Sequence, residues 1–193
     1  MAPDKEQTGG GQTEIIITGF GGQGIILAGN ILGKAATLYD RRHATLIQSY
    51  GPEARGGACA AQVVISGEEI EYPYVETPGL LICMSQEGFT SNIGKLDEKG
   101  SLFIDTGLVD PDPELIGRGI RVHGIGATSL AEEMGVRMMA NIIMLGFVTS
   151  LSGVVSREAL VQAVTSSVPK GTEKKNLAGL EAGFEKGNKV KSD

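Results

Sequence analysis

Apolar and polar positions follow two different periods along the chain, and each period predicts one kind of element. Short runs rich in β-branched residues, bounded by glycine or polar turns, predict buried strands. Longer segments whose apolar residues recur every three to four positions predict amphipathic helices. The predicted strands are 14–18, 43–48, 61–66, 80–84, 101–105 and 119–123. The predicted helices are 24–39, 87–96, a short one opened by 129–132, 137–151, 157–168 and 173–186.

Some helix ends carry their own signals. Ser129 and Glu132 have the spacing of a capping box, which predicts that Ser129 opens a short helix and that Gly135 ends it. Ser156 is expected to cap the helix over 157–168. Strands alternate with helices at spacings suited to βαβ units. The predicted fold class is therefore α/β, with a single open, mainly parallel, Rossmann-like sheet flanked by helices.

The length and charge narrow the class of protein. The chain has 193 residues, which suits one domain, expected over 14–187 between a disordered tail at 1–13 and a frayed tail at 188–193. A net charge of −6 argues against a nucleic-acid-binding protein, whose surface is usually basic. The sequence shows neither a long apolar run nor a secretory leader. We therefore expect no membrane association and a cytoplasmic location.

The sharpest local motif is GFGGQG at residues 19–24, which matches G-x-G-x-x-G between a predicted strand and a predicted helix. Glycines let the backbone approach a pyrophosphate, whose charge meets free N–H groups at the start of the helix. The alternative is a tight strand-to-helix turn without a ligand. The candidate cofactor-binding residues here are Gly19, Gly21, Gly22, Gln23 and Gly24.

A nicotinamide cofactor also needs an acidic side chain at the end of the second strand, to hold the ribose hydroxyls. That strand ends in Ile47-Gln48-Ser49, so the loop suits a phosphate-bearing ligand better than NAD.

A second candidate motif, YGPEARGG at residues 50–57, follows the second predicted strand. Loops at the carboxyl ends of strands are where open α/β sheets bind ligands. Arg55 can hold a phosphate or carboxylate with two hydrogen bonds, and Gly56 and Gly57 beside it complete the candidate set. The alternative is an ordinary surface loop with a pair between Glu53 and Arg55.

No catalytic residue and no metal site is assigned. His43 and His123 are isolated, Cys59 and Cys83 have no neighbouring activator, and Lys34 is expected to be a solvated helix lysine. A nucleotide-type loop without catalytic groups suggests a subunit of a larger enzyme.

Asn141 interrupts a strongly apolar predicted helix, so its amide must find partners. It can brace a loop or face another subunit, but a satisfied core amide is favoured. The apolar face formed by Met138, Met139 and Ile142 exceeds what the core obviously needs, so part of it, or the YGPEARGG loop, is expected at a subunit interface.

Three segments, ITGFGGQGIILAGNILGKAA, SYGPEARGGACAAQVVIS and SQEGF…LFIDTG, together resemble one family. It is the gamma subunit of the 2-oxoacid:ferredoxin oxidoreductases, and the resemblance runs from about residue 15 to 182. It implies one subunit of an enzyme that converts a 2-oxoacid, coenzyme A and oxidised ferredoxin into acyl-CoA, CO₂ and reduced ferredoxin. The segment SYGPEARGG resembles the 2-oxoglutarate branch most.

The resemblance also implies where the cofactors lie. Thiamine diphosphate with Mg and the iron–sulfur clusters are expected on the partner alpha and beta subunits, with a ferredoxin-like delta subunit as a further candidate. This chain has no thiamine–metal motif, and its two cysteines are too few for a cluster. In fused relatives the matching domain is associated with coenzyme A, which the two glycine motifs would contact.

The isolated chain is therefore expected to be inactive and to meet ferredoxin only indirectly. Two alternatives stay open: a scaffold subunit whose glycine loop touches only partner protein, and an independent dinucleotide-binding oxidoreductase.

Overall fold

The computed structural model describes residues 11–50, 57–114 and 119–192, which form one six-stranded sheet in the order β2-β3-β1-β4-β5-β6. The strands are β1 (Thr13–Phe20), β2 (His43–Tyr50), β3 (Ala58–Ser66), β4 (Leu80–Cys83), β5 (Ser101–Asp105) and β6 (Arg121–Ile125). Strands β1, β4, β5 and β6 pair in parallel, whereas β3 is antiparallel to both neighbours, β1 and β2. Within the described sheet, β3 alone runs against the other strands. The predicted mainly parallel α/β sheet is confirmed.

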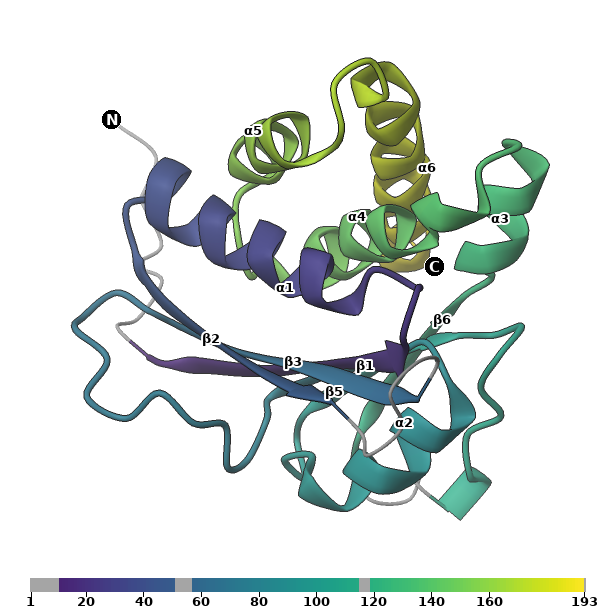
Figure 1. Cartoon of the computed structure of the whole chain (residues 1–193). Helices are drawn as coiled ribbons and strands as arrows, with labels where there is room; N and C mark the ends of the chain where they lie inside the picture. The colour runs from purple at the N-terminus through teal and green to yellow at the C-terminus, as the bar shows by residue number, and fades with distance from the viewer. Residues whose placement is uncertain (1–10, 51–56, 115–118, 193) are drawn as a thin grey trace.

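Helices cover the two faces of the sheet unequally, with α1, α4, α5 and α6 on one face and α2 on the other (Figure 1). The helices are α1 (Ile25–Lys34), α2 (Gln86–Asn92), α3 (Ala127–Glu133), α4 (Ala140–Ser152), α5 (Arg157–Ser167) and α6 (Glu173–Ser192). Three short turns adjoin them: the π-helical η1 (Ala35–Tyr39) after α1, and the 3-10 turns η2 (Ile93–Lys95) after α2 and η4 (Arg137–Met139) before α4. Within the described ranges, every helix is too short or too polar to cross a lipid bilayer.

Helix α4 lies on the face of the sheet that carries α1, α5 and α6, and all its residues from Ala140 to Thr149 are buried. Its long contact with α6 depends on glycine. A Cβ on Gly146 of α4 would overlap the carbonyl oxygen of Leu180, and a Cβ on Gly183 of α6 would overlap that of Ile143. The two helix backbones therefore touch where these glycines cross, which places α6 as a third layer over α4 and the sheet.

This close packing narrows one expectation, which stays a prediction for Met138 and the YGPEARGG loop, and corrects another. Met139 and Ile142 are each 1% exposed in the chain's own core, so of the predicted interface face only Met138, 78% exposed, is open to a partner. Helix α6 continues to Ser192, so residues 188–192 are helical rather than a frayed tail. The buried face of α6, made of apolar residues and glycines, packs against α4. This packing holds the helix in place although its exposed face is highly polar.

Among the element boundaries that differ from the prediction, those of α3 and β6 show a local cause. Helix α3 begins at Ala127, so Ser129 lies inside it and does not cap it, although Gly135 follows its end in the expected left-handed conformation, with a φ of +74°. Strand β6 begins at Arg121 rather than at 119, because Gly119 has a φ of +81°, outside the extended region of regular strands.

Candidate functional site

The glycine loop and the two described residues of the second motif, Tyr50 and Gly57, lie at the carboxyl edge of the sheet. Residues 19–24 form the glycine loop, which leads from β1 into α1, and β2 ends at the same edge because it runs in the direction of β1. The backbone N–H of Gly21 donates to the carbonyl oxygen of Gly57 at 3.0 Å, which joins the glycine loop to the end of the second motif. Arg55 and Gly56, the other predicted residues of that motif, lie outside the described residues.

The start of α1 is open to an anion. Gly24 caps it with a φ of +73°, no side chain caps it, and its first turn carries no acidic residue. Gly22 is exposed with a φ of +97°, and the N–H groups of Gly22 and Gly24 have no acceptor among the described residues. Uncapped N–H groups and the helix dipole together make such a helix start electropositive.

Three other helices satisfy their first N–H groups with side chains. Ser85 Oγ accepts from Gly88 N at the start of α2, and Ser156 Oγ accepts from Ala159 N at the start of α5, which confirms the predicted cap. For α3 the cap comes from β5, where the buried Asp105 carboxylate accepts from the N–H and hydroxyl of Thr128 at 2.9 and 2.6 Å. Against this pattern, the bare start of α1 identifies the candidate site.

Gln23 holds the loop in place rather than pointing out of it. Its side-chain oxygen accepts from the N–H of Phe20 at 2.6 Å, and its Nε2 donates to the carbonyl of Met84, at the end of β4, at 2.8 Å. A Cβ on Gly19 would overlap this side chain and that of Ile25, so Gly19 is needed for packing. Of the five predicted loop residues, Gly22 and Gly24 are the two with free N–H donors.

Asn141, at the start of α4, braces the glycine loop from below. Its Nδ2 donates to the carbonyl of Gly24 at 3.0 Å, and its Oδ1 accepts from the N–H of Ile142 at 2.9 Å. The side chain is 2% exposed, and a Cβ on Gly24 would overlap its Nδ2. The favoured interpretation, a core amide whose hydrogen bonds are satisfied, is confirmed. One of the two hydrogen bonds of Asn141 goes to the glycine loop, so the side chain also braces that loop.

The remaining candidate groups have structural surroundings. Burial raises the pKa of both the Cys59 and the Cys83 thiol, so both stay protonated and unreactive at neutral pH. Lys34 is not simply solvated, because its Nζ donates to the carbonyl of Ser166 at 3.1 Å and to Ser167 Oγ at 3.3 Å, at the end of α5. In the part of the chain that the structure describes, no three His, Cys, Asp or Glu residues cluster closely enough to hold a metal ion.

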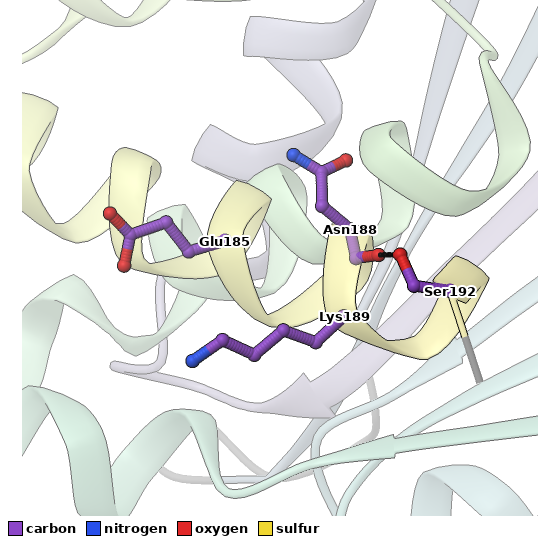
Figure 2. Close-up of a pocket in the computed structure, with 4 residues that line it drawn as sticks. All are labelled: Glu185, Asn188, Lys189 and Ser192. Atoms are coloured by element: carbon purple, nitrogen blue, oxygen red, sulfur yellow. Dashed lines mark hydrogen bonds between the residues drawn. The ribbon is translucent and has the colours of Figure 1, made fainter.

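One open depression lies on α6, far in sequence from the glycine loop. Figure 2 shows its lining, Glu185, Asn188, Lys189 and Ser192, along a single stretch of that helix. The Ser192 hydroxyl donates to the carbonyl of Asn188 at 3.0 Å. The side chains of one solvent-facing helix form no enclosed binding site.

The sequence profile of the pyruvate ferredoxin/flavodoxin oxidoreductase family matches residues 14–186. The chain belongs to this family. It is 47% identical over 175 residues to the 2-oxoglutarate synthase subunit KorC of Methanocaldococcus jannaschii, covering 89% of this chain and 92% of that one. It is 36% identical over 140 residues to the ketoisovalerate oxidoreductase subunit VorA of Methanothermobacter marburgensis, covering 72% of this chain and 28% of that one.

Solved structures of family members share the fold. The gamma subunit of a keto/oxoacid ferredoxin oxidoreductase from Geobacter sulfurreducens superposes with a TM-score of 0.78 at 36% identity, covering 91% of this chain and 98% of that one. A 2-oxoglutarate:ferredoxin oxidoreductase from Magnetococcus marinus, with 2-oxoglutarate, coenzyme A and succinyl-CoA bound, gives 0.82 at 22% identity, over 92% of this chain and 31% of that one. The curated family members are thus subunits of oxidoreductases.

Proposed function

We propose that this chain is the gamma subunit of a 2-oxoglutarate:ferredoxin oxidoreductase and that its glycine loop contacts coenzyme A. The observation that carries the coenzyme A contact is the uncapped start of α1, with the free N–H groups of Gly22 and Gly24 at the carboxyl edge of the sheet. Identity supports the choice of 2-oxoacid, since it is 47% to a KorC relative but 29% to a pyruvate synthase subunit PorC.

The residues of the loop fit the pyrophosphate of coenzyme A. A Cβ on Gly22 would meet nothing within 4 Å, so the backbone can be approached closely there. The chain carries a net charge of −6, so long-range attraction cannot draw in an anion and the site must act locally through N–H donors and the helix dipole. Arg55 is proposed as a further contact to a phosphate of the same ligand. Coenzyme A supplies the thiol that accepts the acyl group.

The redox chemistry is assigned to partners. We propose that thiamine diphosphate with Mg and the iron–sulfur clusters lie on alpha and beta subunits, and that ferredoxin meets this chain only indirectly. The domain limits 14–187 and the cytoplasmic location stay predictions. An independent dinucleotide-binding oxidoreductase is not favoured, because the relatives are subunits and β2 has no acidic residue at its end, Gln48-Ser49-Tyr50.

Steady-state kinetics on the reconstituted complex distinguish a coenzyme A contact from the scaffold alternative, in which the glycine loop touches only partner protein. Gly22→Ala places a methyl group where the pyrophosphate would approach, and we expect the KM for coenzyme A to rise about tenfold with 2-oxoacid decarboxylation unchanged. Arg55→Ala is expected to raise that KM by about 10- to 150-fold, the worth of one charged hydrogen bond. The purified single chain should show no 2-oxoacid oxidation.

Gly171→Ala is the matched control, since Gly171 also has a positive φ, +89°, and open space around it, but lies between α5 and α6. It carries the same backbone strain without touching the loop, and should leave the KM for coenzyme A unchanged. Wild-type KM values in both Gly22→Ala and Arg55→Ala would show that the loop is structural and that the chain is a scaffold.

A further inference from the structure

A pocket of about 400 Å³ lies at the opposite edge of the sheet from the glycine loop. Its floor is formed by the first residues of three neighbouring parallel strands, Leu80 of β4, Ser101 of β5 and Arg121 of β6. Its walls are the last turns of α4 and α6, including Leu151 and Val190. This volume falls in the range of small-molecule sites, about 300–1,000 Å³.

The ionisable side chains that line this pocket are Arg121, His123 and Lys191, and no lining residue is acidic. Within the described residues, neither Arg121 nor Lys191 has a carboxylate within 4.0 Å, since the two ion pairs found there involve other residues. The surrounding protein is acidic, with a net charge of −6. Unpaired cationic groups concentrated in one hollow of an acidic protein need an explanation other than general surface charge.

Arg121 is held in a fixed position. Its Nε donates to Ser101 Oγ at 3.2 Å, and its Nη2 donates to the carbonyl of Lys99 at 3.3 Å. Ser101 is 5% exposed, and its hydroxyl hydrogen has no acceptor among the described residues. Nη1 of Arg121 likewise has no acceptor there. A positioned guanidinium and a buried hydroxyl thus offer unused donors to the same hollow.

His123 adds a third donor. Its ring stacks on Phe103, with 5.0 Å between centroids and 26° between planes, and its nitrogens make no hydrogen bond within the described ranges. Burial and the charge of Arg121 lower the pKa of His123. The groups around it in the pocket are Ser101 and Phe103 on β5, Leu151 and Ser152 on α4, and Val190 and Lys191 on α6.

We propose that this pocket binds a small organic anion, a carboxylate or phosphate carried on a compact apolar body. Arg121, Ser101, His123 and Lys191 would surround the anionic group with donors, as anion sites require. Leu80, Leu151 and Val190 would cover the apolar body. The proposal is independent of the coenzyme A contact, because the two sites lie at opposite edges of the sheet.

Imidazole NMR on the full chain provides the test, since His43 and His123 are its only histidines and each gives one assignable set of signals. Butyl phosphate and butyrate are titrated in parallel, with inorganic phosphate to measure the contribution of the apolar body. We expect a saturable shift of the His123 signals and none at His43, with butyl phosphate binding more tightly than inorganic phosphate. Whichever of the two butyl ligands binds more tightly identifies the anionic group.

Substitutions then locate the site. Arg121→Gln is expected to weaken binding about tenfold, Lys191→Gln several-fold, and Arg121→Lys less than Arg121→Gln. Lys189→Gln is the matched control, because Lys189 lies on the same helix turn but does not line this pocket. The proposal is overturned if neither butyl ligand gives a saturable His123 shift, if His43 shifts equally, or if Lys191→Gln and Arg121→Gln both bind like Lys189→Gln.

Discussion

The glycine loop and the glycines of helix α6 use the same residue for opposite purposes. In the loop, Gly22 is exposed, has a φ of +97°, and a Cβ there would meet nothing within 4 Å. In α6, Gly183 is buried, has helical geometry, and a Cβ there would overlap the backbone of α4. Glycine keeps space empty beside the backbone in the first case and lets another helix fill that space in the second.

The difference shows which glycines bind and which pack. A glycine whose N–H has no acceptor among the described residues and whose Cβ position is open, as at Gly22, is a candidate for ligand contact. Gly24 combines both roles, because its N–H also has no acceptor there while a Cβ on it would overlap Asn141 Nδ2. A glycine whose missing side chain is replaced by protein, as at Gly146, Gly183 and also Gly19, carries stability instead. Predictions that separate these roles follow, from the largest expected effect to the smallest.

Gly183→Ala should cause the largest loss of stability. The new methyl group overlaps the Ile143 carbonyl, which is backbone and cannot rotate away, so the two helices must separate. We expect the free energy of unfolding to fall by at least about 3 kcal/mol, measured by urea denaturation. Gly33→Ala on α1 is the control, because open space surrounds Gly33, and it should gain up to about 1 kcal/mol from helix propensity. Equal stability of the two variants would contradict the close contact of α4 and α6.

Asn141→Ala should have an intermediate effect and is the variant that links the loop to the core. It removes the donor to Gly24 and the acceptor for the N–H of Ile142 in a nearly fully buried position. The expected loss is about 1–3 kcal/mol of unfolding free energy. In the reconstituted complex the KM for coenzyme A should also rise, because the loop is no longer held.

Asn30→Ala is the matched control for this variant, since Asn30 is an exposed residue of α1. It should be neutral or slightly stabilising and should leave the KM unchanged. If Asn141→Ala lost stability with no change in that KM, the brace would serve the core alone.

The smallest effect is expected at His123, which lines the pocket at the amino ends of β4, β5 and β6. Burial and Arg121 lower the pKa of His123, so below its unfolded value of 6.5 the folded chain binds fewer protons than the unfolded chain. The contribution of His123 therefore leaves the free energy of unfolding unchanged above about pH 6.5. That free energy decreases as the pH falls from there toward the lowered pKa of His123. His123→Gln should flatten this decrease in thermal melts, and a slope identical to wild type would contradict it.

Much of the fold could be predicted from the sequence, because local patterns determine local structure. The β-branched runs located all six strands of the described sheet, although several of their bounds differ by two or three residues. The GFGGQG turn placed the start of α1 within one residue, and Ser156 was recognised as a cap. The capping box at Ser129 was a wrong prediction, because the carboxylate of Asp105 occupies the start of α3 and the helix begins two residues earlier. That choice depends on a residue from another strand, which no local pattern contains.

The sequence alone determined that a glycine loop sits between the first strand and the first helix, and glycine is the residue that most readily adopts the positive φ values found at Gly22 and Gly24. Only the tertiary structure decided which side chains hold that loop: Gln23 reaches the end of β4, and Asn141 reaches Gly24 from 117 residues away. It likewise decided that the apolar face of α4 is core, because α6 packs over it through glycine contacts. Such contacts join residues that are far apart in sequence and depend on how helices and strands pack. A local sequence pattern contains only residues that are close together along the chain.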